Sequence, residues 1–117
     1  MYERHIIGKK GEEIAVDYLK SIGYTIIERN FLCRQGEIDV IALDNKYIVI
    51  IEIKSRTNQE YGLPSEAVTK TKLKHILKTA AYYLHVKKME DANVRIDVVE
   101  VYVKENRYYI NHLKQII

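Results

Sequence analysis

The strongest pattern of apolar and polar positions runs from Gly36 to Arg56, GEIDVIALDNKYIVIIEIKSR. Both halves of this stretch are rich in β-branched residues. In places apolar and polar residues alternate, and elsewhere the apolar residues are continuous, which predicts two adjacent strands joined by a tight turn. The second half, Tyr47 to Ile53, is almost continuously apolar and is typical of a strand that is covered on both faces. The sequence therefore predicts a buried β-hairpin near the middle of the chain.

Three charged side chains interrupt this hairpin: Asp39, Glu52 and Lys54. Burying an unpaired charge is costly, so charges at the exit of a buried strand indicate a site rather than a scaffold. Glu52 and Lys54 project from the same face because they lie two residues apart. If Asn45-Lys46 forms a two-residue turn, Asp39 falls opposite Glu52 on that face. A three-residue loop without a bulge would place Asp39 on the other face.

A helical pattern extends from Gly8 to Ile22. Extending its apolar stripe towards the N-terminus reaches Glu12, which we expect to face the core, whereas Glu13 should face outward. Both glutamates also suit the positive end of a helix, which is a sufficient explanation for Glu13. The inward phase of Glu12 favours a role in a site. The apolar positions of the stripe are Ala15, Leu19 and Ile22.

The remaining pattern predicts a first strand at Tyr24 to Phe31 and a loop at Ser55 to Pro64. A long amphipathic helix is expected at Ser65 to Val86, a strand at Val94 to Val103 and an edge strand at Tyr108 to His112. Taken in order, these elements give αβββαββ, which predicts an α/β fold.

The long helix has one apolar and one basic side. Lys70, Lys74 and Lys78 repeat at helical spacing on the basic side, and a solvated face is the usual meaning of such lysines. Lys72 is the exception, because it lies at the edge of the apolar stripe. That stripe comprises Val68, Leu73, Ile76, Leu77, Ala80, Ala81 and Leu84.

Composition indicates one globular domain, residues 1–117, because 47% of the residues are hydrophobic and 30% are charged. A net charge of +3 is too small to predict nucleic-acid binding by itself. The single cysteine, Cys33, cannot form an internal disulfide, and the N-terminal residues lack the apolar segment of a signal peptide. No apolar run reaches membrane-spanning length. We therefore expect a cytoplasmic protein without a membrane partner.

Other chemistries find little support in the sequence. The histidines show no metal-ligand spacing with each other or with Cys33, which disfavours zinc. There is no glycine-rich phosphate loop. Tyr82 and Tyr83 on the long helix are expected to pack rather than stack on bases. Asp97 is expected to anchor Arg95 or a loop and receives no catalytic role.

Several segments together resemble the YraN family of predicted nucleases, a branch of the restriction-endonuclease-like or PD-(D/E)XK superfamily. GEID and EIKSR, in that order and separation, are the most specific of them. The resemblance implies a restriction-endonuclease-like αβββαβ core with a mixed central sheet flanked by helices, here with an extra C-terminal edge strand. One departure is Ile38, which stands where the superfamily's name has proline. The similar segments are GEEIAVDYLKSIGY, RNFLCRQGEIDVIALD, IVIIEIKSR, AVTKTKLKHILKTAAYYL and RIDVVEV.

The resemblance also implies roles for individual residues. Asp39 and the Glu52-Ile53-Lys54 tripeptide would occupy the superfamily's metal and catalytic positions. Glu12 matches a glutamate on the first helix of resolvase-like members, and Lys72 matches a basic position on their second helix.

Phosphodiester hydrolysis through Mg²⁺, with Mn²⁺ as a substitute, suits these residues. Asp39 and Glu52 would be direct ligands, the Ile53 carbonyl a third, and Glu12 a ligand directly or through water. Lys54 would orient or deprotonate the attacking water. The expected catalytic set is thus Glu12, Asp39, Glu52 and Lys54.

We expect Arg56, Lys72, Lys70 and Lys74 to contact phosphates of a nucleic acid, with DNA as the first expectation. The sequence leaves open RNA, and branched or linear substrates. A first alternative is a non-catalytic nucleic-acid-binding module that retains the fold. A second is a structural or interaction protein in which Glu52 and Lys54 form an ordinary ion pair within a strand. A homodimer that positions two sites is a further expectation.

Overall fold

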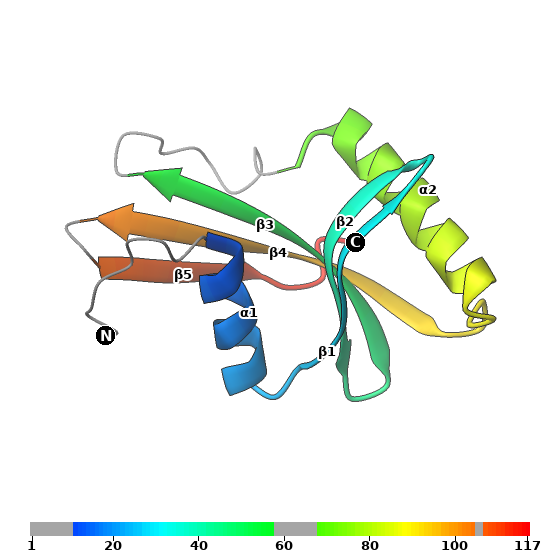
Figure 1. The fold of residues 1–117 in the computed structure, drawn as a ribbon, viewed down its shortest axis with the longest axis horizontal. Coiled ribbons are helices and arrows are strands. Elements are labelled where there is room, and N and C mark those ends of the chain that lie inside the picture. The colour runs from blue at the N-terminus through cyan, green and yellow to red at the C-terminus, as the bar shows by residue number, and fades with distance from the viewer. Residues whose placement is uncertain (1–10, 58–67, 105–106) are drawn as a thin grey trace.

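The computed structural model describes residues 11–57, 68–104 and 107–117. A helix, three strands, a second helix and two strands follow one another along the chain (Figure 1). No helix within these described ranges has the length and the apolar character needed to cross a membrane. The elements are α1 (Gly11–Ser21), β1 (Thr25–Cys33), β2 (Gly36–Asp44), β3 (Tyr47–Thr57), α2 (Lys70–Val86), β4 (Asn93–Lys104) and β5 (Arg107–Leu113).

The strands form one mixed sheet in the order β1-β2-β3-β4-β5. The central pair, β3 and β4, runs parallel, while the other neighbouring strands run antiparallel. A parallel pair needs a long connection, and α2 lies in that connection. β5 is an edge strand, as predicted. The predicted fold class is therefore confirmed: a mixed sheet flanked by two helices, consistent with a restriction-endonuclease-like core.

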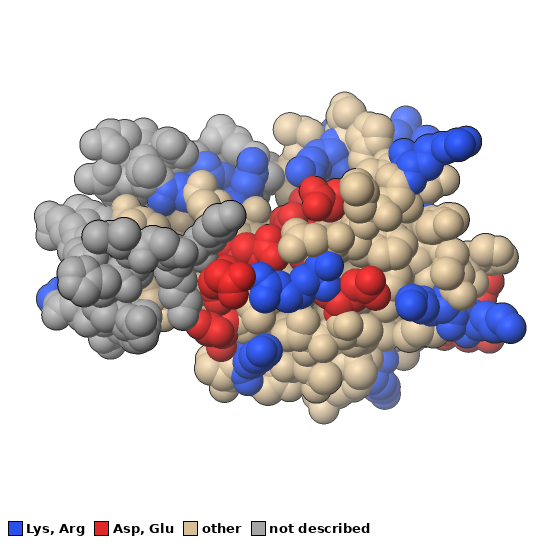
Figure 2. Space-filling model, viewed as in Figure 1, with Lys and Arg blue, Asp and Glu red and all other residues tan. Residues whose placement is uncertain are grey.

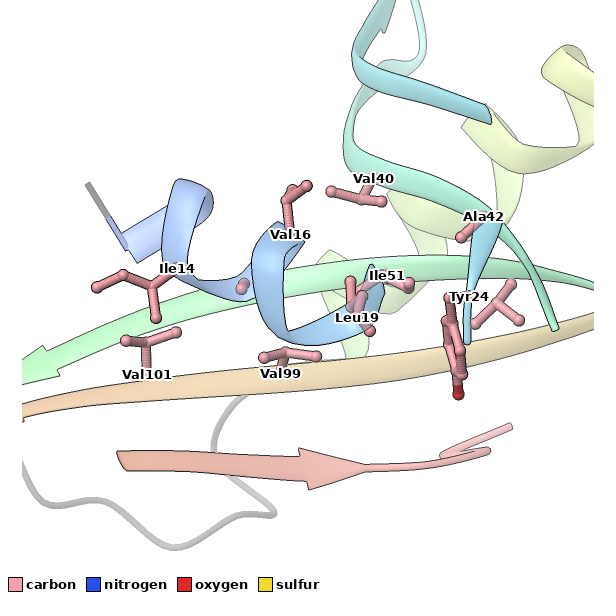
Figure 3. Packing of buried hydrophobic residues seen from close by; sticks show 11 residues of the cluster. Ile14, Val16, Leu19, Tyr24, Val40, Ala42, Ile51, Val99 and Val101 are labelled. Atoms are coloured by element: carbon pink, nitrogen blue, oxygen red, sulfur yellow. The ribbon is translucent and has the colours of Figure 1, made fainter. Parts of the chain in front are cut away.

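The two helices cover opposite faces of the sheet, as the alternation along β3 demonstrates. Val49 and Ile51 belong to a buried cluster with α1, whereas Ile48 and Ile50 belong to a second cluster with α2. Burying each such side chain contributes about 1.5–3 kcal/mol, so burial on both faces stabilises the position of β3 in the sheet. Figure 3 shows the first cluster, in which Ile14 and Leu19 of α1 lie against β3 and β4, while Val16 points towards Val40 of β2.

The hairpin register is as predicted. Asp44 pairs with Tyr47, which leaves Asn45-Lys46 as a two-residue turn. Asn45 takes the left-handed φ of 55° that such turns require and that asparagine tolerates. The predicted loop is wrong at Ser55, because β3 continues beside β4 as far as Thr57; the rest of that loop lies outside the described residues.

The first helix differs from prediction at its C-terminal end. It ends at Ser21, after which Gly23 adopts a left-handed φ of 99° and turns the chain towards β1. Ile22 is consequently 43% exposed, so its predicted place in the core is wrong. The predicted start at Gly8 lies outside the described residues.

The second helix begins later than the predicted Ser65. Val68 and Thr69 precede the helix, and the side chain of Thr69 caps it by accepting a 3.1 Å hydrogen bond from the backbone N–H of Lys72. Residues 65–67 lie outside the described residues. This cap fixes the backbone of the first turn, which carries Lys70 and Lys72.

The buried face of α2 is also rotated relative to the prediction. Leu77 and Ala81 are exposed, whereas Tyr83 is buried with its ring 5.0 Å from that of Phe31 on β1. Thr79 is fully buried, and its hydroxyl is satisfied by a helix carbonyl one turn back. The cause is the β1–β2 hairpin, which packs against this side of the helix and buries the helix residues on that side.

Candidate functional site

Strands β2 and β3 separate at Asp39. Their backbone pairing ends at Val40 opposite Ile51, whereas β3 continues beside β4 to Thr57. Figure 1 shows β1 and β2 curving away from β3 beyond this point. One carboxylate oxygen of Asp39, Oδ2, accepts a 2.8 Å hydrogen bond from the backbone N–H of Ile53. The carboxylate thus takes the place of a backbone partner where the sheet opens.

The alternation of side chains along β2 breaks at Asp39. Ile38 belongs to the cluster on the α2 side, yet Val40, two residues further, belongs to the cluster on the α1 side. On β1, Asn30 lies opposite this position and has a left-handed φ of 54°. The predicted register of β2 with β3 is therefore right. Asp39, however, lies beyond the last backbone pair, where the backbones of β1 and β2 are irregular, and it reaches the neighbourhood of Glu52 from between β2 and β3.

Glu52 is a buried carboxylate, only 5% exposed. Its Oε1 lies 3.4 Å from the Nζ of Lys72, while Oε2 is buried and has no hydrogen-bond partner among the described residues. Burial and the charge of Asp39 raise the pKa of Glu52 to about 7, against the opposing effect of Lys72. A buried oxygen without a partner is costly, so this carboxylate is suited to a cation or to a hydrogen-bond donor.

Burial raises the pKa of Asp39 as well, although the Ile53 N–H and the charge of Lys72 act in the opposite direction. The charges of Glu12 and Glu37 add to the increase in the pKa of Asp39. Ionising Asp39 together with Glu52 is therefore unfavourable unless a cation compensates both charges.

Glu12 lies beside these two carboxylates, and side chains of β1 hydrogen-bond to it. Its Oε2 accepts hydrogen bonds of 2.9 Å from Arg29 Nη2 and of 2.9 Å from Asn30 Nδ2, and Arg29 also binds Glu13. The side chain of Glu12 is 26% exposed, so it points less deeply inward than the helical stripe predicts. Arg29 and Asn30 were missed by sequence reasoning, although two adjacent polar residues within a predicted strand were a usable signal.

The first turn of α1 approaches β3 closely at Gly11. A Cβ atom on Gly11 would lie 1.8 Å from the Oγ of Ser55, so glycine permits this approach where a side chain would not. The contact brings Glu12 towards the strand that carries Glu52. Figure 2 shows acidic side chains gathered between α1 and α2 on this face of the molecule, with basic side chains over α2.

The donor set fits a magnesium ion better than a metal enclosed by protein ligands. Among the residues that the structure describes, no three His, Cys, Asp or Glu side chains converge into a group that could hold a metal. Asp39 and Glu52 form a pair, since the Glu12 carboxylate is engaged by β1. Mg²⁺ commonly takes one or two protein carboxylates and keeps several waters, so the pair is sufficient. Lys54 follows Glu52 by two residues and is exposed.

The basic candidates differ in their surroundings. Lys70, Lys72 and Lys74 are exposed in the first turns of α2. Arg56, in contrast, pairs through Nε with the fully buried Glu100 at 3.0 Å and keeps only 13% of its side chain exposed. A phosphate could reach Arg56 only in competition with a buried carboxylate.

A second polar cluster surrounds Asp97, which is fully buried. As predicted, Asp97 anchors Arg95, with 3.0 Å between Nε and Oδ1. His112 Nε2 lies 2.7 Å from Asp97 Oδ2, and Tyr24 donates a 3.1 Å hydrogen bond to the same oxygen. Although burial opposes it, the bonds from His112 and Arg95 hold the pKa of Asp97 well below its usual range. This cluster is internally satisfied and links β4, β5 and the turn after α1.

The fold and the two neighbouring carboxylates define an α/β protein with a desolvated acidic site where β2 and β3 separate. A profile of the uncharacterised protein family UPF0102 matches residues 11–101, and the chain belongs to this family, which is the YraN family that the sequence resembles. The family description names no activity.

Relatives match over most of their length. A UPF0102 protein of Clostridium perfringens (strain 13) is 43% identical over 110 residues, which cover 92% of this chain and 90% of the relative. One from Persephonella marina is 44% identical over 107 residues (92% and 91%), and one from Clostridium botulinum (strain Hall) is 52% identical over 96 residues (81% and 78%).

Among solved structures, Pyrococcus furiosus SfsA in complex with Ca²⁺ is similar at a TM-score of 0.42 and 19% identity. The similarity covers 92% of this chain and 62% of the SfsA chain. Likeness at this level carries no functional argument.

Proposed function

We propose that this protein is a Mg²⁺-dependent nuclease that hydrolyses phosphodiester bonds in nucleic acid, with DNA as the first substrate to test. The observation that carries the proposal is buried Glu52, whose Oε2 has no partner among the described residues, beside Asp39 where β2 leaves β3. Two desolvated carboxylates at one point are unfavourable unless a cation joins them. The resemblance of the GEID and EIKSR segments to predicted nucleases supports the same assignment.

Asp39 and Glu52 would hold the metal, with the Ile53 carbonyl as a third ligand and Glu12 acting through water. Bound Mg²⁺ would supply charge stabilisation at a phosphoryl oxygen and a more acidic water. The Ile53 N–H fixes Asp39 through Oδ2, which leaves Oδ1 available. Arg29 orients the Glu12 carboxylate from the outside, as neighbours of metal ligands commonly do.

Lys54 would position the attacking water. It is exposed on β3 two residues beyond Glu52, and a strand places these two side chains on one face. In its neutral form the amine of Lys54 can accept the proton of the water, and in its charged form it can stabilise negative charge at phosphorus. Removal of this amine should therefore slow turnover without removing the metal ligands.

The start of α2 would bind the nucleic-acid backbone. Lys70, Lys72 and Lys74 are exposed there, and a helix N-terminus also favours anions. Contacts of this kind recognise phosphates rather than bases, so the proposal includes little sequence preference. Arg56 contributes less, because Glu100 already engages its guanidinium.

A cleavage panel tests the proposal. Single-stranded, duplex, flapped and four-way-junction DNA, and matching RNA, are incubated with wild-type protein in Mg²⁺ or Mn²⁺. We expect Asp39→Asn and Glu52→Gln to reduce cleavage by about 100-fold or more, because each removes a ligand charge. Asp91→Asn is the matched control, since Asp91 is an exposed acid before β4 and is not part of the proposed site.

Two results would contradict the proposal. Cleavage that survives in both ligand variants would place the reaction elsewhere. Absence of cleavage on every substrate, together with retained salt-sensitive binding, would favour the non-catalytic nucleic-acid-binding module instead.

A further inference from the structure

The ion pair between Lys72 and Glu52 is asymmetric. The side chain of Glu52 is 6% exposed, whereas that of Lys72 is 56% exposed. The Nζ of Lys72 lies 3.4 Å from Oε1, and Oε2 receives no hydrogen bond from the described residues. A largely solvated amine therefore extends to a buried carboxylate and satisfies one side of it.

The backbone of Lys72 is fixed even though its side chain is long. The Thr69 cap accepts a hydrogen bond from the Lys72 N–H, so the first turn of α2 holds the Cα of Lys72 above the site. Four flexible methylene groups separate that Cα from the ammonium group. The ammonium group can therefore leave Glu52 without any movement of the helix.

The charges at this point are unequal. Asp39 and Glu52 together bring two negative charges when both are ionised, and Lys72 supplies one positive charge. A divalent cation would compensate both carboxylates, and Glu52 Oε2, which has no partner among the described residues, would be available to it. More than half of the Lys72 side chain is exposed to water, which weakens its hold on the carboxylate. Mg²⁺ bound here would therefore compete with the Lys72 ammonium for the same carboxylate.

We propose that Lys72 is an exchangeable counter-ion of Glu52, which holds this carboxylate in the metal-free protein, is displaced when a divalent cation binds, and then contacts a phosphate of the nucleic acid. This inference rests on the proposed metal site. It assigns Lys72 two successive partners and couples metal loading to the capture of the substrate backbone. In this scheme Lys72 acts first on Glu52 and then on the phosphate backbone of the nucleic acid, and it does not act on the reacting atoms.

Lys72→Met separates this role from general electrostatics, because methionine retains an apolar stem and lacks the charge. Lys74→Met is the matched control: Lys74 is exposed on the same helix, and its substitution changes the net charge by the same amount. Calorimetric titration with Mg²⁺ and Mn²⁺ should show about fivefold tighter metal binding in Lys72→Met and little change in Lys74→Met. Equal affinity in wild type and Lys72→Met, or weaker binding in the variant, would overturn the inference.

A second measurement follows the amine directly. Wild-type protein is labelled briefly with an amine-acylating reagent, with and without Mn²⁺, and each lysine is quantified by mass spectrometry. We expect Mn²⁺ to increase acylation of Lys72 about twofold or more, since release from Glu52 exposes the amine further, and to leave Lys74 unchanged. Unchanged or reduced acylation of Lys72 at saturating metal would contradict displacement.

The two proposals fail differently. Tighter metal binding by Lys72→Met in a protein that cleaves no substrate would uphold the exchange and contradict the nuclease. Cleavage by wild type, combined with identical metal affinities in wild type and Lys72→Met, would uphold the nuclease and contradict the exchange. A wild-type protein that binds neither metal would overturn both.

Discussion

Replacing Glu52 with Gln should stabilise the metal-free protein above pH 7 and change its stability little below pH 5. Burial, together with Asp39, raises the pKa of Glu52 from 4.5 to about 7, so the folded protein binds this proton more tightly than the unfolded chain does. As the pH rises from 4.5 to about 7, the unfolded chain ionises first and gains stability relative to the folded protein. Above pH 7 the full penalty is present in wild type and absent in the variant.

The size of the effect follows from that difference in pKa. About 2.5 pH units at about 1.36 kcal/mol per unit correspond to about 3 kcal/mol. The amide of Gln keeps a polar atom in the buried position of Oε2, which reduces the expected gain to about 2 kcal/mol. For a domain of this size, such a change raises Tm by about 8 °C.

Urea unfolding in the presence of chelator, at intervals from pH 4.5 to 8.5, measures this gain. Asp91→Asn, at an exposed position before β4, is the control and should follow wild type. Adding Mg²⁺ at pH 8 should stabilise wild type and leave Glu52→Gln unaffected. The reasoning is refuted if wild type and Glu52→Gln differ by the same amount at both ends of the pH range, since the buried carboxylate would then carry no desolvation penalty.

Three further outcomes are expected. Lys54→Ala should retain the metal affinity of wild type in calorimetry and lose turnover, whereas Asp39→Asn should lose metal affinity itself; wild-type cleavage by Lys54→Ala would remove Lys54 from the mechanism. Nucleic-acid affinity should fall steeply between about 50 and 200 mM salt, and Lys70→Ala with Lys74→Ala should flatten that dependence; salt-independent binding would exclude the phosphate contacts. Asn30→Ala should destabilise the fold by about 1–2 kcal/mol in urea unfolding, because alanine disfavours a left-handed backbone. Asn30→Gly should lose only the hydrogen bond to the Glu12 carboxylate, so equal losses of stability in the two variants would show that this backbone conformation is unimportant.

The hairpin could be predicted because several independent signals agree on it. The apolar run before Glu52 fixes the faces of β3, and the Asn45-Lys46 turn fixes the register with β2. Charges within such a run could therefore be recognised as a candidate site, and Glu52 is indeed buried. Local patterns of this kind depend on residues that are close in sequence.

The irregularity around Asp39 could not be predicted in the same way. It lies opposite Asn30, which is on another strand and adopts a left-handed backbone that sequence alone does not reveal. The bonds from Arg29 to Glu12 likewise join a strand to a helix 17 residues away. Periodicity also could not show whether Leu77 or Tyr83 of α2 is buried, because adjacent faces of that helix are both partly apolar. The position of the β1–β2 hairpin determines which of these faces is covered.

The hydrogen bond from the Ile53 amide to Asp39 provides a spectroscopic reporter that requires no added label. In most of a sheet an amide proton faces a carbonyl, whose charge is constant, but this one faces a group whose charge changes with protonation and with metal. In an NMR titration, the chemical shift and the solvent exchange rate of the Ile53 amide should therefore report protonation of Asp39 and metal binding at the site. Amides deeper in the hairpin, where Ile41 lies opposite Ile50, should remain fixed and provide the internal reference.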